Sequence, residues 1–174
     1  HLFDSGHFNQ FGPFADFHQR QRSGSLQQLF FDSTFSIMGF IAKSDGRVSQ
    51  LEIQFAEQVM MQMQLRGERR LRAIDQFNLG KSSDFDYQST LTRLRNSCRF
   101  QPSLLKTFLD IQVRAADVKG SMSPSTQEAL RRVFLGLGIS EALFQQYYRR
   151  SRAGYSYQQY GQGDSGKSPQ QHLD

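Results

Sequence analysis

The loop Lys43-Ser44-Asp45-Gly46-Arg47-Val48-Ser49-Gln50-Leu51-Glu52 lies between two apolar runs, and the stretch 34–63 around it decides the fold. Gly46 can take the positive φ that ends a helix, because it has no Cβ. Ser49 can accept a hydrogen bond from a free backbone N–H of the next helix, and Glu52, three residues later, completes a capping box. The stretch therefore predicts two helices joined by a tight turn.

The same pattern of glycine, any residue, apolar residue and serine recurs twice further on. One copy is Gly120-Ser121-Met122-Ser123, followed by Pro124 at the first helical position, where a missing N–H costs nothing. A shorter copy is Gly138-Ile139-Ser140. Helical hairpins of one design indicate either an internal duplication or the common way in which helices begin.

The chain has the size and apolar content of one helical domain with extra residues at its ends. It has 174 residues, of which 37% are hydrophobic, with 16 Phe and no Trp, so Phe must be the main filler of the core. Between residues 25 and 150 the apolar residues recur at steps of three, four and seven, and no alternating strand pattern interrupts them. This periodicity predicts an all-α fold: a single domain of about seven helices with flexible ends.

Finer features of these helices are also predicted. Apolar stripes are expected on the second helix (Ile53, Ala56, Val59, Met60, Met63) and on the third (Leu71, Ile74, Phe77). Gly80 is expected to be the left-handed residue that follows the third helix. The helix that Pro102 opens is expected to be a central helix touched on several sides, because its apolar stripe is wide.

The composition divides the chain into three parts. Residues 1–24 alternate Phe with polar residues and are expected to be a partly disordered lead-in, 25–152 form the helical domain, and 153–174 are rich in Gly, Gln, Ser and Tyr. A stretch like the last cannot offset its ordering entropy by burial, so it is expected to be a flexible linker toward a further module. Because the chain starts at His1 rather than Met, we interpret it as a segment of a longer protein.

The charge of the chain permits several partners and identifies none. The net charge is +5 and the pI is near 9.6, which suits an acidic protein, a nucleic acid or an anionic membrane surface. Two cationic clusters are more typical of solvated helix faces than of a nucleic-acid interface, which would require a steep salt dependence. They comprise Arg69, Arg70, Arg72, Arg149, Arg150 and Arg152.

The sequence contains no recognisable catalytic set, which predicts that the chain is not an enzyme and has no catalytic residue. Cys98 is the single cysteine, which excludes an intrachain disulfide, and we expect it to be a buried or half-buried structural thiol. The four histidines lie in the ends of the chain (His1, His7, His18, His172). Phosphate-binding glycine loops and nucleophile elbows are also missing.

One acidic pair offers a candidate metal site. Asp45 in the loop and Glu52 in the first helical turn could together present oxygens to a hard cation. The alternating acids of a calcium-binding helix–loop–helix are missing, and the capping role of Glu52 and a turn role of Asp45 need no metal. No cofactor is expected, with a divalent cation at Asp45 and Glu52 as the alternative.

Five short blocks stand out within about residues 27–150: LFFDSTFSIMG (29–39), KSDGRV (43–48), LGKS (79–82), FLDIQV (108–113) and LGIS (137–140). In this order they resemble the central region of the DjlA family of bacterial DnaJ-like membrane co-chaperones. The resemblance implies a TerB-like helical domain on the cytoplasmic face of the inner membrane. It also implies an N-terminal membrane segment, through which a homodimer could form, and a C-terminal J domain that stimulates the DnaK-type Hsp70.

The chain departs from that family pattern in two ways. It has no His-Pro-Asp tripeptide, so the J domain lies outside it. TerB-like domains are similar in having two Asp-Gly loops whose acids can bind a metal, but here Lys119 precedes Gly120, and Thr126 occupies the position of an expected acid. The resemblance thus implies a non-catalytic module that binds a protein partner or client and acts as a spacer. The alternative is a TerB-type cation sensor.

Overall fold

The computed structural model describes residues 24–150, and these fall into two compact units, 24–138 and 139–150. The first unit contains six helices: α3 (Gly24–Lys43), α4 (Gln50–Gln62), α5 (Glu68–Gly80), α6 (Tyr87–Ser97), α7 (Pro102–Ala116) and α8 (Pro124–Gly136). The second unit contains a helix at 141–150. The described residues include no strand, so the predicted all-α fold with seven helices is confirmed. The lead-in 1–24, except for Gly24, and the linker 153–174 lie outside the described residues.

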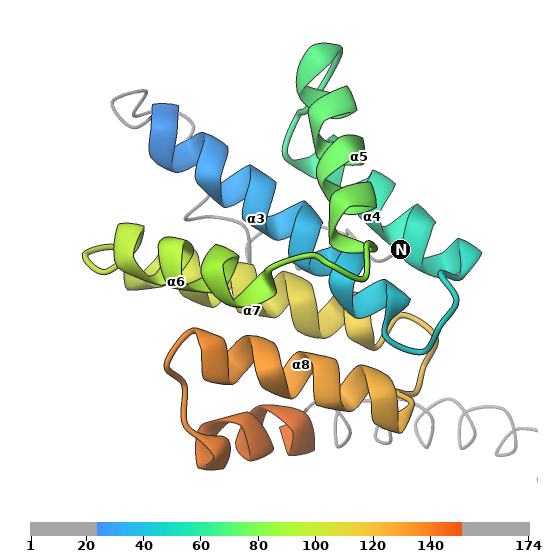
Figure 1. The fold of residues 1–174 in the computed structure, drawn as a ribbon, viewed down its shortest axis with the longest axis vertical. Helices are drawn as coiled ribbons and strands as arrows, with labels where there is room; N and C mark the ends of the chain where they lie inside the picture. Colours follow the sequence, from blue (N-terminus) through green and yellow to red (C-terminus); the bar gives the residue numbers. More distant parts are fainter. Residues whose placement is uncertain (1–23, 151–174) are drawn as a thin grey trace, which may run out of the picture. The chain divides into compact units, whose positions relative to one another are not determined.

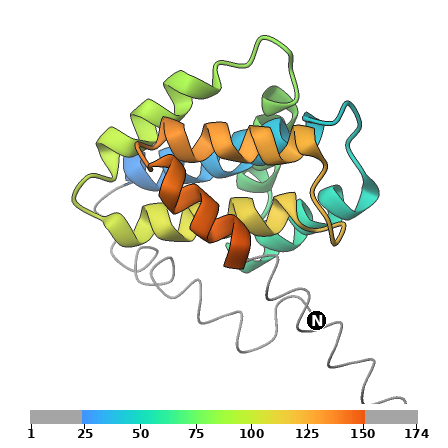
Figure 2. The same ribbon diagram turned by 90° about the horizontal axis from the view of Figure 1, so that it is seen from below.

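Helix α3 is the centre of the first unit. It contacts all five other helices, and its most extensive contact is with α5. Figure 1 shows α8 below α3, α6 and α7, and in the view from below in Figure 2 α8 crosses in front of α3, which it contacts. The helix opened by Pro102, α7, contacts α3, α4 and α8, so it is touched on several sides, as its wide apolar stripe predicts. Between residues 30 and 42, α3 is buried almost all round rather than along one stripe, because small residues let its neighbours approach.

Two glycines bring α3 and α5 together. A Cβ on Gly39 would overlap the carbonyl oxygen of Phe77, and a Cβ on Gly80 would overlap the carbonyl oxygen of Ser36. Gly80 is the last residue of α5, is buried and does not have a positive φ. Its predicted role as a left-handed residue after the helix is wrong, because the position requires close backbone approach rather than an unusual φ.

The core is built mainly from phenylalanine, as the composition predicts. Within the first unit, the fully buried aromatic side chains are Phe30, Phe35, Phe55, Phe108 and Phe134. One polar contact joins two core helices: the Gln112 side chain is fully buried, and its Nε2 donates to the Thr34 carbonyl oxygen at 3.0 Å. Because that carbonyl belongs to α3, the contact ties α7 to the central helix.

The predicted apolar stripe of α4 is confirmed except at Ile53, whereas on α5 Phe77 is buried, Ile74 is half-buried and Leu71 is exposed. On α4, Phe55 is buried and Ile53 is exposed, although Ala56, Val59, Met60 and Met63 point inward as expected. On α5, Leu71 is 60% exposed whereas Ala73 is buried. Both sets have helical spacing, so periodicity alone could not choose between adjacent faces. On α5 the close approach to α3 selects the face with the small residue.

Candidate functional site

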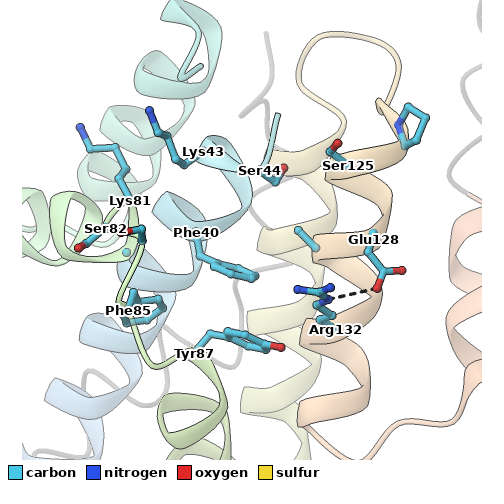
Figure 3. A pocket seen from close by; sticks show the side chains of 14 residues that line it. Phe40, Lys43, Ser44, Lys81, Ser82, Phe85, Tyr87, Ser125, Glu128 and Arg132 are labelled. Carbon is cyan, nitrogen blue, oxygen red and sulfur yellow. Dashed lines mark hydrogen bonds and ion pairs between the residues drawn. The ribbon is translucent and has the colours of Figure 1, made fainter. Parts of the chain in front are cut away.

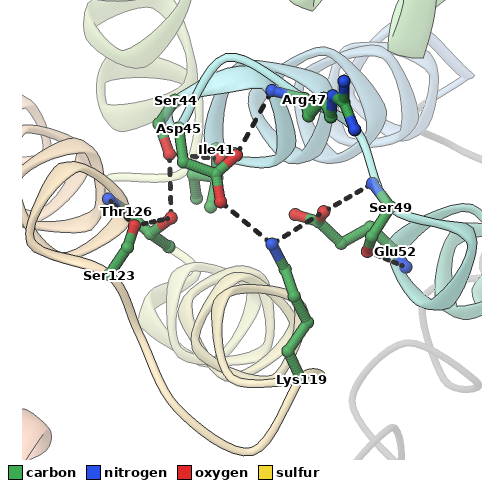
Figure 4. Close-up of polar contacts among 9 residues, drawn as sticks. All are labelled: Ile41, Ser44, Asp45, Arg47, Ser49, Glu52, Lys119, Ser123 and Thr126. Atoms are coloured by element: carbon green, nitrogen blue, oxygen red, sulfur yellow. Dashed lines mark hydrogen bonds and ion pairs between the residues drawn. The ribbon is translucent and has the colours of Figure 1, made fainter.

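The first glycine loop has the predicted local structure. Gly46 has a φ of 91°, and the next helix begins with a complete capping box. The Glu52 N–H donates to Ser49 Oγ at 3.2 Å, and the Ser49 N–H donates to Glu52 Oε1 at 2.9 Å (Figure 4). The Glu52 side chain is only 6% exposed, so the capping box fixes a nearly buried carboxylate at the start of α4.

The second glycine loop lies beside the first. Gly120 has a φ of 87°, and Ser123 caps α8 by accepting the Thr126 N–H at 3.2 Å. The Thr126 hydroxyl oxygen also lies 3.1 Å from the Ser44 hydroxyl, which donates to the Ile41 carbonyl oxygen at 2.6 Å. Thr126, which replaces the acid expected in the family pattern, thus takes part in a hydroxyl contact that joins the two loops (Figure 4).

Lys119 connects the acidic pair of the first loop. Its Nζ lies 2.9 Å from Asp45 Oδ2 and 3.6 Å from Glu52 Oε1, and Figure 4 shows it pointing between the two carboxylates. The hydrogen bond from Lys119 lowers the pKa of Asp45 below its ordinary value of 3.8. The same hydrogen bond raises the pKa of Lys119 above 10.5. Lys119 therefore carries a positive charge at neutral pH, and Asp45 a negative one.

Two features of this arrangement weigh against a divalent cation. Hard cations such as Ca²⁺ take six to eight oxygen ligands, and among residues 24–150 no three His, Cys, Asp or Glu residues are grouped to hold a metal. Asp45 and Glu52 do meet, as the sequence suggests, but the group between them is the ammonium of Lys119. The assignment of a metal to Asp45 and Glu52 stays a prediction for a titration.

Cys98 is a buried thiol, as predicted. Its side chain has no exposed surface, and desolvation raises the pKa to about 11. The thiolate is the reactive form of cysteine, and it is almost absent at neutral pH at such a pKa. Cys98 therefore contributes packing rather than chemistry.

The arginines of α5 are engaged in local contacts. Arg72 forms two hydrogen bonds to Asp32, at 2.9 and 2.8 Å, and Arg70 pairs with Glu57 at 3.4 Å. The Arg69 guanidinium lies over the Phe31 ring, 5.5 Å from its centroid. The first predicted cluster is thus a paired helix face. In the second, Arg149 and Arg150 are exposed, and Arg152 lies outside the described residues.

A groove of about 690 Å³ was not predicted from the sequence. It lies where the end of α3, the loop after α5 and the first turns of α8 meet (Figure 3). The rings of Phe40 and Tyr87 stack with centroids 4.6 Å apart, and Phe85 lies 6.3 Å from Phe40. All three side chains are half-buried. The signal in the sequence that could have found it is Phe85-Asp86-Tyr87, in which an aromatic residue of a polar loop is followed closely by one at the start of α6.

Comparison with known proteins places the chain in a family. Residues 32–149 match the family model described as "Tellurite resistance protein TerB". The chain is 39% identical over 163 residues to "Co-chaperone protein DjlA" of Coxiella burnetii, which covers 92% of this chain and 60% of that protein. The same-named protein of Escherichia coli is 36% identical over 157 residues, covering 90% of this chain and 56% of the relative.

A third relative, "Co-chaperone protein DjlA" of Photorhabdus laumondii, is 38% identical over 143 residues, covering 82% of this chain and half of the relative. The chain thus spans between half and three fifths of the length of these relatives. No solved structure matches it significantly. Helices long and apolar enough to cross a membrane do not occur in the part of the chain that the structure describes. With more than half of its residues matched by the family model, the chain belongs to the TerB family.

Proposed function

We propose that this chain is the central TerB domain of a membrane-anchored DnaJ-like co-chaperone and that it acts there as a non-catalytic module. It binds a protein partner or client and separates the membrane anchor from a J domain that stimulates a DnaK-type Hsp70. The observation that carries the proposal is the similarity to DjlA co-chaperones over 82% to 92% of the chain.

The chemistry of the described residues supports a binding role. None of the four histidines of the sequence lies within 24–150, and the thiol of Cys98 is buried with a raised pKa. Cation sensing is the alternative, supported by the pair Asp45 and Glu52. The ammonium of Lys119, at 2.9 and 3.6 Å from their oxygens, weighs against it.

The proposal includes a layout for the parent protein. Residues 1–24 connect to a segment in the bacterial inner membrane, 25–152 form the domain on the cytoplasmic face, and 153–174 lead to the J domain. The membrane segment offers the route to a homodimer, and no nucleic acid is involved. The parent reading frame tests this layout directly. An apolar run of about 20 residues should precede His1, and a His-Pro-Asp module should follow Asp174. Without these two features the layout would be wrong.

The role of the domain is tested in the parent protein by replacing residues 25–152 with a Gly/Ser linker. In a reconstituted assay the J domain of this variant should stimulate the Hsp70 ATPase as the parent does, because the stimulating residues lie elsewhere. In cells that depend on the co-chaperone, the variant should fail to complement a deletion. Full complementation by the linker variant would contradict a partner-binding role.

A further inference from the structure

Three cationic residues line the groove whose aromatic floor is formed by Phe40, Phe85 and Tyr87. Lys43 lies at the end of α3, Lys81 in the loop after α5, and Arg132 on α8. In Figure 3 the Arg132 guanidinium points toward Phe40, whereas the Lys43 and Lys81 side chains lie at the opposite end and extend away from the rings. A basic rim around half-buried rings offers both a charged contact and apolar surface that a ligand can cover.

Each cation is held in place by one described contact. The Lys43 ammonium donates to the Gly46 carbonyl oxygen at 3.1 Å, and the Lys81 ammonium lies 5.8 Å from the centroid of the Phe77 ring. An ammonium has three N–H donors, so both lysines are positioned and still have donors for an anionic group.

The acidic residue that lines the groove does not neutralise this rim. Glu128 accepts from Arg132 Nε at 3.1 Å and from Arg131 Nη1 at 3.2 Å, so two guanidinium groups share one carboxylate. Arg132 has further N–H donors beyond that contact. The groove therefore keeps a net positive charge.

We propose that this groove binds an acidic peptide segment of a partner protein. An apolar side chain of the segment covers the Phe40 and Tyr87 rings, and flanking carboxylates contact Lys81 on one side and Arg132 on the other. The inference deepens the proposed function by naming the surface and the chemistry of the partner, and its biological role rests on that function. Binding itself is measurable on this chain alone.

The arrangement of charges favours a peptide over a membrane surface. A ligand must place an apolar group between two sets of negative charges, on a floor that lies below the rim. In an extended segment successive side chains point to opposite sides and rise about 3.3 Å per residue, so acidic and apolar groups can be spaced in this way. Lipid headgroups lie in one plane and do not reach a recessed floor. A volume of about 690 Å³ is also within the range of about 300–1,000 Å³ of ligand pockets.

The test is a titration of the ¹⁵N-labelled 174-residue chain with a blocked heptapeptide that has one Phe between two runs of three acidic residues. Amide shifts should saturate and cluster at Phe40, Lys81, Tyr87 and Arg132. A peptide with Ala in place of Phe, and one with Asn and Gln in place of the acids, should each bind about tenfold more weakly, because each loses one of the two contacts. Raising NaCl from 50 to 300 mM should weaken binding about threefold or more.

Matched variants locate the site. Lys81→Glu and Tyr87→Leu should each weaken binding of the acidic peptide about tenfold, whereas Arg66→Glu should leave it unchanged. Arg66 is an exposed cation between α4 and α5 and does not line the groove, so it controls for net charge. Circular dichroism and thermal melting establish that each variant is folded. If Lys81→Glu does not fold, Arg132→Gln replaces it.

Three results would overturn the inference. They are the absence of saturable shifts at the groove, equal weakening by Arg66→Glu and Lys81→Glu, and binding to vesicles of anionic phospholipid without binding to the peptide. Any of these results would refute peptide binding at the groove but would not test the proposed function, which the linker replacement tests separately. Conversely, peptide binding together with full complementation by the linker variant would retain the groove as a site and refute the proposed role.

Discussion

Replacing Lys119 with Met should destabilise the domain, because the change leaves two carboxylates facing each other without the cation between them. The Lys119–Asp45 pair is partly exposed, with 34% and 23% of the side chains accessible, and an ion pair of this kind contributes about 0.2–1 kcal/mol. Glu52 is 6% exposed and would lose the Lys119 ammonium but keep the hydrogen bond from the Ser49 N–H. An unsatisfied buried polar group costs about 1–3 kcal/mol, and because Glu52 keeps one partner we expect a cost at the low end of this range. Together these give a loss of about 1–2 kcal/mol.

The assay is urea and thermal unfolding followed by circular dichroism at pH 7. A loss of about 1–2 kcal/mol corresponds to a fall in Tm of about 4–8 °C for a domain of this size. A cycle with Asp45→Asn and the double variant isolates the pair, and the coupling free energy should be about 0.5–1 kcal/mol. An unchanged or higher Tm for Lys119→Met, or a coupling free energy of zero, would refute the reasoning.

The pH dependence provides a second check on the same pair. The pKa of Asp45 is lowered in the folded state, so its contribution is present above the unfolded value of 3.8 and is lost as the pH falls through the folded pKa. The pKa of Lys119 is raised, so its contribution is present below 10.5 and is lost as the pH rises through the folded pKa. The stability difference between the parent and Lys119→Met should therefore be largest between these values and shrink at both extremes.

Three further predictions concern a close approach, the thiol and the metal. Gly80→Ala should lower the free energy of unfolding in urea by about 1–3 kcal/mol, because the added Cβ overlaps a backbone oxygen of α3. Gly24→Ala is the control: it has open space around it and should change stability by less than about 0.5 kcal/mol. Equal effects of the two substitutions would contradict the close contact between α3 and α5. Cys98 should react with a thiol reagent at pH 8 in urea and not in the folded state, since burial raises its pKa to about 11; fast reaction of the folded chain would show that the thiol is accessible. Calcium titration of the unsubstituted 174-residue chain should give no saturable heat. Saturable heat that disappears in the double variant Asp45→Ala, Glu52→Ala would instead establish a metal site.

Local signals in the candidate site could be predicted from the sequence. The positive φ of Gly46 and the capping box of Ser49 and Glu52 depend on residues within a few positions of one another, and both are confirmed. The ion pairs of Lys119 could not be predicted in this way, because it is 74 residues away from Asp45 and meets it only when the two glycine loops lie side by side. The sequence shows that the second glycine loop lacks the expected acid, but it does not show that Lys119 of that loop would contact Asp45 and Glu52 of the first.

The groove illustrates the same division. Phe40 belongs to a helix in which every apolar residue is expected to be in the core, so the sequence does not single it out. Tyr87 begins a different helix, far from Phe40 along the chain. Their rings stack because α3 and α5 meet through Gly39 and Gly80, which places the loop after α5 against the end of α3.

The sequence by itself determined the helices, the starts of α4 and α8, the phenylalanine core and the burial of Cys98. Each of these depends on short-range hydrogen bonding or on composition. The tertiary structure alone decided that α3 contacts every other helix of the first unit, that Leu71 of α5 is exposed while Ala73 is buried, and which charges meet. These outcomes depend on contacts between segments far apart in the chain, such as the close backbone approach of α3 and α5 at Gly39 and Gly80.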